Sequence, residues 1–196
     1  MIGVVDYEAG NIASISNALA AIGTEFVVSS DAGELERCSG LILPGVGAAP
    51  GAMASLERVG LTPFLRSASV PLLGICLGMQ LLYESSEEGL TNCLALVPGS
   101  VQRFDSRTSK IPHMGWNEVE QISPGPLMAG IASKEFFYFA HSYCSAVDGT
   151  TIAVTKEGTP FASVIQSGRV MGVQFHPEKS GATGLRLLKN FADLCK

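Results

Sequence analysis

Cys76 lies in the stretch of this sequence with the clearest chemical potential. An apolar run leads into Gly74-Ile75-Cys76-Leu77-Gly78, and a second apolar segment follows it. This spacing is typical of a nucleophile elbow, in which a strand, a sharp turn and a helix present one reactive side chain, here cysteine in place of serine. The glycines leave room for the turn, and the helix N-terminus favours a thiolate. A buried, inert cysteine between turn-forming glycines would explain the motif by itself equally well.

His176 and Glu178 form a second cluster, near the end of the chain. They follow an apolar strand candidate, and Pro177 separates them. In extended backbone, residues two apart point to the same side, and proline fixes the φ angle between them. Glu178 could then accept a hydrogen bond from one imidazole nitrogen and leave the other for a nucleophile. Alone, the pair is better explained as a strand-end histidine beside a solvated glutamate, but together with Cys76 it favours a Cys-His-Glu triad.

The remaining histidines, His113 and His141, are predicted to be structural. His113 leads into a strand candidate, and His141 ends the aromatic segment 136–140. Hydrogen-bonded structural histidines are commoner than catalytic ones in such positions. The phenylalanines at 136, 137 and 139 are predicted to lie in the core. Trp116 fits either a core position or an anchor in an interface.

The elements that would position these groups follow an alternating pattern in the first half of the chain. Apolar strand candidates at 2–5, 24–29, 40–43 and 70–75 alternate with helix candidates at 12–22, 31–37, 50–58 and 62–67. Buried strands separated by helices predict parallel βαβ units with right-handed crossovers. Ligand sites in such sheets lie at the carboxyl ends of the strands. We therefore expect the loop at 44–47 and the Cys76 turn to share one site.

The second half of the chain changes character. Glycine-containing turns separate the short strand candidates 100–104, 117–122, 136–142, 151–156, 161–166 and 169–175. These turns favour hairpins and partly antiparallel pairing. A closing amphipathic helix is predicted over 184–194, with Leu187, Leu188, Phe191 and Leu194 buried. The predicted fold class is therefore α/β, a mostly parallel central sheet flanked by helices with an added partly antiparallel sheet, in a single domain over residues 1–196.

Composition excludes several classes of function. The 196 residues carry 13 Lys and Arg and 18 Asp and Glu, a net charge of −5, without a long basic run, so nucleic-acid binding is not expected. No apolar stretch is long enough for a membrane span, and the start of the chain lacks the basic segment of a signal peptide. The five cysteines show no C-x-x-C spacing, so neither a disulfide framework nor a metal site is expected. No cofactor is expected either, and we predict a cytoplasmic location.

The two chemical stretches resemble the class I, triad-type glutamine amidotransferases, which have a flavodoxin-like fold. Residues 74–80 (GICLGMQ) and 174–178 (QFHPE) carry this resemblance. Further stretches are similar to the glutaminase subunits of imidazole glycerol phosphate synthase, over residues 2–180. They are Asp6-Tyr7 with Gly10-Asn11, then 44–47 (PGVG), 112–117 (PHMGWN), 141–143 (HSY) and 179–180 (KS).

The resemblance implies a role for each of the motif residues. Cys76 would attack the side-chain amide of glutamine, and His176, oriented by Glu178, would protonate the departing ammonia and then activate water. Backbone N–H groups of Leu77 and of the Gly45-Val46-Gly47 loop would hold the oxyanion. Other contacts to glutamine would come from Gln80, His141, Ser142 and Tyr143.

The resemblance also implies a protein partner. The ammonia would pass to a (β/α)8-barrel cyclase subunit, which would make imidazole glycerol phosphate and aminoimidazole-carboxamide ribotide in histidine biosynthesis. The residues expected to face this partner are Asn11, Trp116, Tyr138 and Lys179. Two alternatives remain open from the sequence. They are the glutaminase of another biosynthetic complex and a non-catalytic, regulatory relative.

Overall fold

The central element of the fold is a mixed sheet of nine strands in the order β2-β1-β3-β4-β13-β12-β11-β8-β9. The computed structural model describes all residues, 1–196. The first five strands are parallel, namely β2 (Phe26–Ser29), β1 (Ile2–Val5), β3 (Gly40–Leu43), β4 (Leu72–Ile75) and β13 (Val170–Val173). The other four are antiparallel, namely β12 (Thr159–Ser167), β11 (Thr151–Glu157), β8 (His113–Gln121) and β9 (Glu135–His141).

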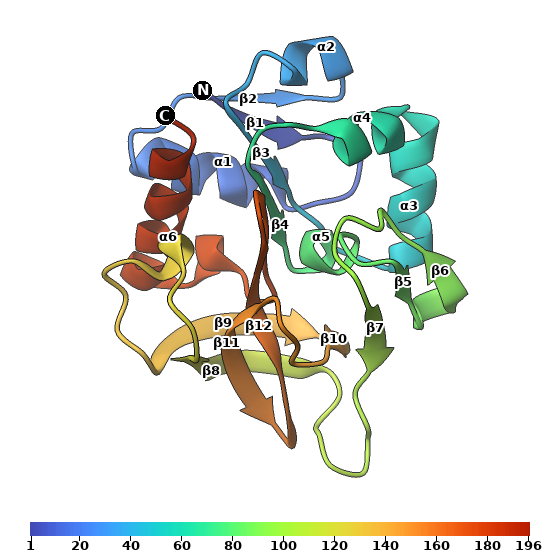
Figure 1. Cartoon of the computed structure of the whole chain (residues 1–196), viewed down its shortest axis with the longest axis vertical. Helices are drawn as coiled ribbons and strands as arrows, with labels where there is room; N and C mark the ends of the chain where they lie inside the picture. Colours follow the sequence, from blue (N-terminus) through green and yellow to red (C-terminus); the bar gives the residue numbers. More distant parts are fainter.

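Helices cover both faces of the parallel part of the sheet (Figure 1). One side carries α1 (Ile12–Ala21) and α6 (Gly181–Leu194), which contact each other, while α2 (Ala32–Leu35), α3 (Ala49–Arg58), α4 (Leu61–Ser67) and α5 (Leu77–Gln80) lie on the other. Two hydrophobic clusters correspond to these layers. One contains Leu19 and Phe191, and the other contains Leu35 and Leu56. Both faces of the parallel strands are thus buried, which explains their continuous apolar sequences.

A small second sheet joins β10 (Tyr143–Ser145), β7 (Ser100–Arg103), β5 (Ser85–Ser86) and β6 (Thr91–Asn92). Single turns of 3-10 helix, η1 (Glu88–Leu90), η2 (Pro126–Met128) and η3 (Pro177–Lys179), complete the structure. The predicted α/β fold with an added, partly antiparallel sheet is confirmed. The antiparallel strands β12, β11, β8 and β9 extend the main sheet, and the small second sheet is separate from them. None of the helices has both the length and the apolar character that crossing a membrane requires.

Two side chains predicted to be buried are instead exposed. Phe137 and Phe139 are fully buried, but Phe136 is 51% exposed because alternate residues of a strand point to opposite faces. Leu194, the last residue of α6, is 41% exposed, whereas Leu187 and Leu188 lie in the core. The apolar stripe of α6 therefore ends before the helix does.

The helix predicted to begin near Leu77 begins there but spans one turn only. The backbone N–H of Leu94 donates to the carbonyl of residue 81, that of Ala95 to the carbonyl of residue 83, and that of Leu96 to the carbonyl of residue 82. These carbonyl groups are thus used by a neighbouring segment rather than by the next helical turn. The short helix packs against β4, and the segment at 94–97 is bonded to the residues that follow the helix.

Candidate active site

The turn at Cys76 has the geometry of a nucleophile elbow. Cys76 lies between β4 and α5 with φ 53° and ψ −111°, an uncommon conformation for a residue with a side chain. A Cβ atom on Gly78 would lie 1.9 Å from the carbonyl oxygen of Leu43, and one on Gly74 would lie 2.7 Å from the carbonyl carbon of Gly78. The two glycines are therefore needed because the backbones approach too closely for any side chain.

Sheet register brings His176 to the same edge as Cys76. β4 and β13 are parallel neighbours in which Ile75 is paired with Val173. The backbone N–H of Cys76 also donates to the carbonyl of Val173 at 2.8 Å. The chain continues from β13 through Gln174 and Phe175 to His176, so the imidazole arrives beside the sulfur although 100 residues separate the two positions in sequence.

His176 and Glu178 form a buried ion pair. His176 Nδ1 lies 2.8 Å from Glu178 Oε1, and their side chains are 5% and 1% exposed. Burial alone would lower the pKa of His176, but hydrogen bonds to Cys76 and Glu178 and the negative charge of these groups outweigh it, so the pKa is raised. The imidazolium form of His176 is thus favoured beside the sulfur.

Cys76 and His176 line a pocket of about 350 Å³. Ten of its lining residues are ones to which the sequence analysis assigned an individual role, namely Val46, Gly47, Cys76, Leu77, Gln80, His141, Ser142, Tyr143, His176 and Lys179. Four others line it as well, namely Glu88, Pro112, Met114 and Ala140. Gly45 packs against α5, where a Cβ atom would lie 2.5 Å from the Gly78 nitrogen. Glu178 pairs with His176 and does not line the pocket.

Backbone donors lie next to the sulfur. Leu77 is the first residue of α5, so its N–H has no partner within the helix. Across the pocket, Val46 is 43% exposed and belongs to the loop between β3 and α3. The hydroxyl of Tyr7, which is fully buried, donates a 2.7 Å hydrogen bond to the carbonyl of Pro44 and anchors the start of this loop.

Amide side chains support the wall of the pocket. Gln80 Nε2 donates to the carbonyl of Tyr143 at 2.8 Å and to Gln174 Oε1 at 3.1 Å. Gln174 Nε2 in turn lies 3.9 Å from the Cys76 sulfur. Sequence reasoning placed Gln174 in a motif but gave it no role. The structure shows that it links Gln80 to the sulfur.

Glu88 is a pocket residue that the sequence analysis missed. Its Oε2 accepts a 2.7 Å hydrogen bond from the backbone N–H of Ala49, the first residue of α3, and it is the only carboxylate lining the pocket. The preceding residue, Ala48, has no capping side chain, so Glu88 supplies the cap from another part of the chain. The only sign in the sequence that another segment must cap α3 was the absence of a capping residue at the start of this helix.

Of the four residues expected to face a partner, three form one cluster. The Trp116 and Tyr138 rings are 6.2 Å apart, and Lys179 Nζ lies 5.8 Å from the Tyr138 ring centre. Trp116 is 55% exposed, which excludes a core position. Asn11, at the start of α1, is partly exposed and makes no side-chain capping hydrogen bond there.

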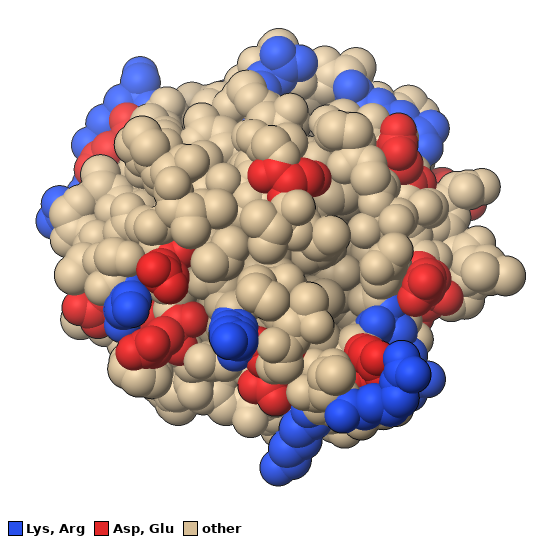
Figure 2. All heavy atoms as spheres, turned by 60° about the horizontal axis from the view of Figure 1, so that its bottom comes forward, with Lys and Arg blue, Asp and Glu red and all other residues tan.

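The surface beside this cluster is apolar near the pocket, whereas Glu118, which is paired with Phe136, is exposed further along β8 on the same face. Trp116 and Tyr138 are opposite each other on β8 and β9, and Met114 and Phe136, which are 65% and 51% exposed, lie on the same side of this hairpin. Figure 2 shows the lower part of the molecule of Figure 1 turned forward, with charged residues mainly towards the edge and few of them in the middle.

Comparison with known proteins identifies the family. The family model described as "Glutamine amidotransferase class-I" matches residues 3–194. A protein of Xanthomonas campestris pv. campestris (strain 8004) named "Imidazole glycerol phosphate synthase subunit HisH" is 43% identical over 194 residues, covering 98% of this chain and 97% of its own length. A protein of the same name from Moorella thermoacetica is 46% identical over 201 residues, covering 100% and 95%.

Solved structures share the fold at lower identity. A Thermoplasma acidophilum protein described as part of a putative GMP synthase matches with a TM-score of 0.76 and 21% identity, covering 99% of this chain and 92% of that one. A structure described as a glutamine amidotransferase matches with a TM-score of 0.76 and 20% identity, covering 99% and 98%. At these identities the likeness concerns the fold alone.

Proposed function

The chain belongs to the class I glutamine amidotransferase family, and from this premise we propose that it is the glutaminase subunit of an imidazole glycerol phosphate synthase. It would supply ammonia for a step of histidine biosynthesis in the cytoplasm. The relatives carrying that name are 42–46% identical and cover 95–98% of their own length. The observation that carries the chemistry is the meeting of Cys76, His176 and Glu178 beside one pocket.

In the first step, the Cys76 thiolate attacks the side-chain amide carbon of glutamine and forms a tetrahedral intermediate. The oxyanion receives hydrogen bonds from the N–H of Leu77 and from the loop of Gly45, Val46 and Gly47. The imidazolium of His176 then gives its proton to the leaving nitrogen, so that ammonia departs and a γ-glutamyl thioester remains on the sulfur.

In the second step, neutral His176 takes a proton from water, and the hydroxide attacks the thioester carbon. Glutamate leaves and the Cys76 thiolate is regenerated beside the protonated imidazole. Glu178 holds the ring through its 2.8 Å contact with Nδ1, which keeps Nε2 free for the sulfur and for water. The raised pKa of His176 supports a ring that is protonated at rest and can give its proton to the leaving nitrogen.

Glutamine would lie between Glu88 and the wall formed by residues 140–143. Glu88 is the only carboxylate in the pocket, so we propose that it receives the α-ammonium group of the substrate. Gln80 and the backbone of His141, Ser142 and Tyr143 would hold the remaining polar groups. A pocket of about 350 Å³ suits a ligand of this size.

The partner would be a cyclase subunit with a (β/α)8 barrel, which would receive ammonia before water protonates it. The apolar part of the outer side of the β8–β9 hairpin borders the pocket, since Met114 lines it and Trp116 lies two residues further along β8. Such a surface suits burial against another protein. Asn11, Tyr138 and Lys179 remain our proposed contacts around it.

Trapping and reconstitution test this proposal together. A glutamine-mimicking electrophile should form one covalent adduct, on Cys76, and mass spectrometry of the intact chain should detect it. With the cyclase and its nucleotide ligand, the chain should convert glutamine efficiently, but alone it should be nearly inactive. Cys76→Ala should abolish glutamine-dependent synthesis and leave synthesis from ammonium salts intact. Capture of a different biosynthetic partner, with no stimulation by the cyclase, would favour another amidotransferase complex.

A further inference from the structure

His113 and His141 are joined ring to ring beneath the wall of the pocket. They lie opposite each other on the antiparallel strands β8 and β9, and His113 Nδ1 is 3.0 Å from His141 Nε2. Both side chains are buried, and the rings of Phe104, Phe139 and Phe161 surround them. In an apolar site, two polar rings need fully matched hydrogen bonds.

The carbonyl of Tyr143 determines where the hydrogens of this pair lie. It is 2.8 Å from His141 Nδ1, and since a carbonyl oxygen only accepts, Nδ1 carries the hydrogen. Burial lowers the pKa of His141 to about 3, so the ring is neutral at neutral pH. His141 Nε2 is then an acceptor, and the hydrogen between the rings belongs to His113 Nδ1.

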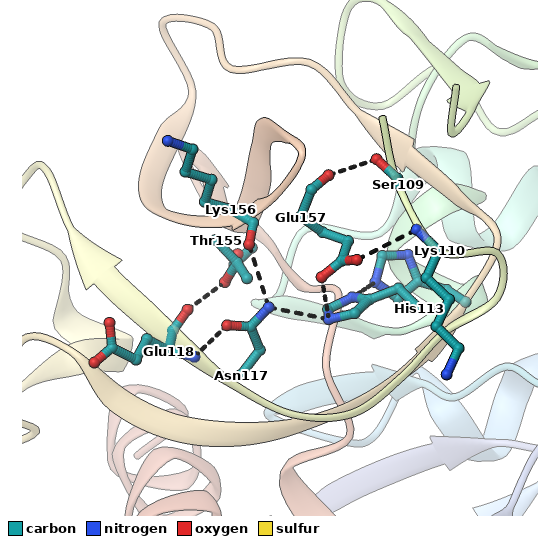
Figure 3. Close-up of polar contacts among 10 residues, drawn as sticks. Ser109, Lys110, His113, Asn117, Glu118, Thr155, Lys156 and Glu157 are labelled. Atoms are coloured by element: carbon teal, nitrogen blue, oxygen red, sulfur yellow. Dashed lines mark hydrogen bonds and ion pairs between the residues drawn. The ribbon is translucent and has the colours of Figure 1, made fainter. Parts of the chain in front are cut away.

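Asn117 closes the other end of the pair. Its Nδ2 lies 3.1 Å from His113 Nε2 and also donates to the carbonyl of Lys156 at 3.3 Å. The backbone N–H of Glu118 donates to Asn117 Oδ1 at 2.8 Å, which fixes the amide with its donor towards the imidazole. Figure 3 shows Asn117 pointing at the ring. Since Nε2 receives a hydrogen bond, neutral His113 carries its hydrogen on Nδ1.

Glu157 approaches the same nitrogen from the protein surface. Its Oε2 lies 3.8 Å from His113 Nε2, and its Oε1 accepts from the backbone N–H of Lys110 (Figure 3). Burial lowers the pKa of His113 in spite of this carboxylate. The Asn117 amide is nearer, so His113 is held neutral by an oriented donor.

The series of hydrogen bonds from Asn117 through His113 and His141 ends at the wall of the proposed glutamine pocket. The carbonyl of Tyr143, which accepts from His141, also accepts from Gln80 Nε2 at 2.8 Å. Gln80, His141 and Tyr143 all line the pocket, whereas His113 does not. The only side-chain hydrogen bond that joins His113 to a residue of the pocket wall is the one to His141.

We propose that His113 is a positioning residue for glutamine binding, which holds His141 as the Nδ1–H tautomer and thereby fixes the Tyr143 carbonyl and the Gln80 amide. This inference rests on the proposed glutaminase function. His113 touches neither the substrate nor the sulfur. Its effect should therefore appear in the binding of glutamine rather than in the reactivity of Cys76.

Two substitutions at His113 separate positioning from bulk. In His113→Asn, the amide nitrogen lies near the place of Nδ1 and still donates to His141. In His113→Leu, no donor remains, and a buried acceptor loses its partner. In the complex with the cyclase, His113→Leu should raise the KM for glutamine about tenfold, and His113→Asn should stay within about threefold of the wild type. Synthesis from ammonium salts should be unchanged in both.

Equal impairment of the two variants, or an unchanged KM in His113→Leu, would overturn the proposal. A role in filling space predicts loss of thermal stability without a difference in KM between the two variants.

A spectroscopic test does not depend on turnover. In the full chain labelled with 15N-histidine, both His113 and His141 should give the shifts of neutral Nδ1–H tautomers. An Nε2–H tautomer at either position would refute the inference. If the wild type in complex with the cyclase lacks glutaminase activity, the function proposal fails, whereas the tautomers still test separately whether His113 holds His141 in the proposed form.

Discussion

His176 Nδ1 lies 2.8 Å from Glu178 Oε1, and the second carboxylate oxygen of Glu178 is buried without any hydrogen-bond partner. A buried carboxylate with one unmatched oxygen is costly to keep. Its only polar contact is with an imidazole whose pKa it helps to raise. The pair therefore places a negative charge where it stabilises the protonated ring, and it gives Glu178 a definite role to test.

Glu178→Gln should slow glutamine hydrolysis strongly while preserving shape. A neutral amide no longer stabilises the imidazolium, so we expect kcat in the reconstituted complex to fall by about a hundredfold or more. Glutamate release at saturating glutamine measures this. The control is synthesis from ammonium salts, which does not use the triad and should be retained. A variant with nearly normal kcat would exclude a role for the negative charge of Glu178.

The same substitution should change how stability depends on pH. The pKa of His176 is raised above 6.5 in the folded chain. The stability that this group contributes is therefore fully present below about pH 6.5 and is lost as pH rises through the raised pKa. The difference in unfolding free energy between wild type and Glu178→Gln should shrink in alkali. Urea unfolding from pH 6 to 10 measures it, and a difference that grows with pH would contradict this sign.

His141 should make the chain sensitive to acid. Its pKa is lowered to about 3 by burial, whereas the unfolded value is near 6.5. Between these values the unfolded chain binds a proton that the folded chain does not, so stability falls as pH decreases, by up to about 1.4 kcal/mol per unit. In His141→Asn, the amide can still donate to the Tyr143 carbonyl but does not titrate. Urea midpoints from pH 7 to 4 should decline less steeply in this variant.

Tyr7→Phe should loosen the loop that carries the proposed oxyanion donors. The substitution removes the donor to the Pro44 carbonyl and leaves that oxygen buried, which should cost about 1 kcal/mol of stability. Because the loop of Gly45, Val46 and Gly47 starts at this anchor, kcat should fall several-fold with little change in KM. Steady-state kinetics of the complex and urea unfolding measure both effects. A rise in KM alone would place the effect on glutamine binding instead.

Gly78→Ala should disrupt the elbow. The new methyl group would lie 1.9 Å from the Leu43 carbonyl oxygen, which is backbone and cannot move aside cheaply. We expect a loss of more than about 3 kcal/mol of stability or failure to fold. Gly51→Ala, in the first turn of α3 with nothing within 4 Å of the added Cβ, is the matched control and should stabilise by up to about 1 kcal/mol. Similar behaviour of the two variants would contradict the close approach.

The features that the sequence predicted most accurately are turns and helix starts, which depend on residues close together in the chain. The elbow at Cys76 follows from two glycines at fixed spacing, and the helix candidate at 31–37 corresponds to α2, which Asp31 caps through the N–H of Glu34. The register of β4 against β13, which brings His176 to the sulfur, is a long-range pairing that no local pattern encodes. The sequence suggested that Cys76 and His176 lie close together only because their two motifs would combine into a catalytic triad.

The features that the sequence did not reveal depend on contacts between distant segments. Glu88 reaches the pocket by capping a helix 39 positions away, and no motif surrounds it. His113 and His141 were predicted as separate structural histidines, and only the pairing of β8 with β9 makes them one unit. The strands at 85–86 and 91–92 are too short to show a period of two. The one-turn length of α5 is set by hydrogen bonds from residues 94–96.

Glu88→Gln should weaken glutamine binding without weakening the fold. The amide oxygen of the substituted side chain at position 88 can still accept from the Ala49 N–H, so the cap on α3 is kept while the negative charge is lost. If Glu88 holds the substrate's α-ammonium, KM should rise about tenfold or more, with a much smaller change in kcat. The sharper measurement uses a substrate analogue that lacks the α-amino group. Wild type should strongly prefer glutamine, and the variant should lose most of that preference, because the analogue never used the carboxylate. An unchanged preference would assign Glu88 to helix capping alone.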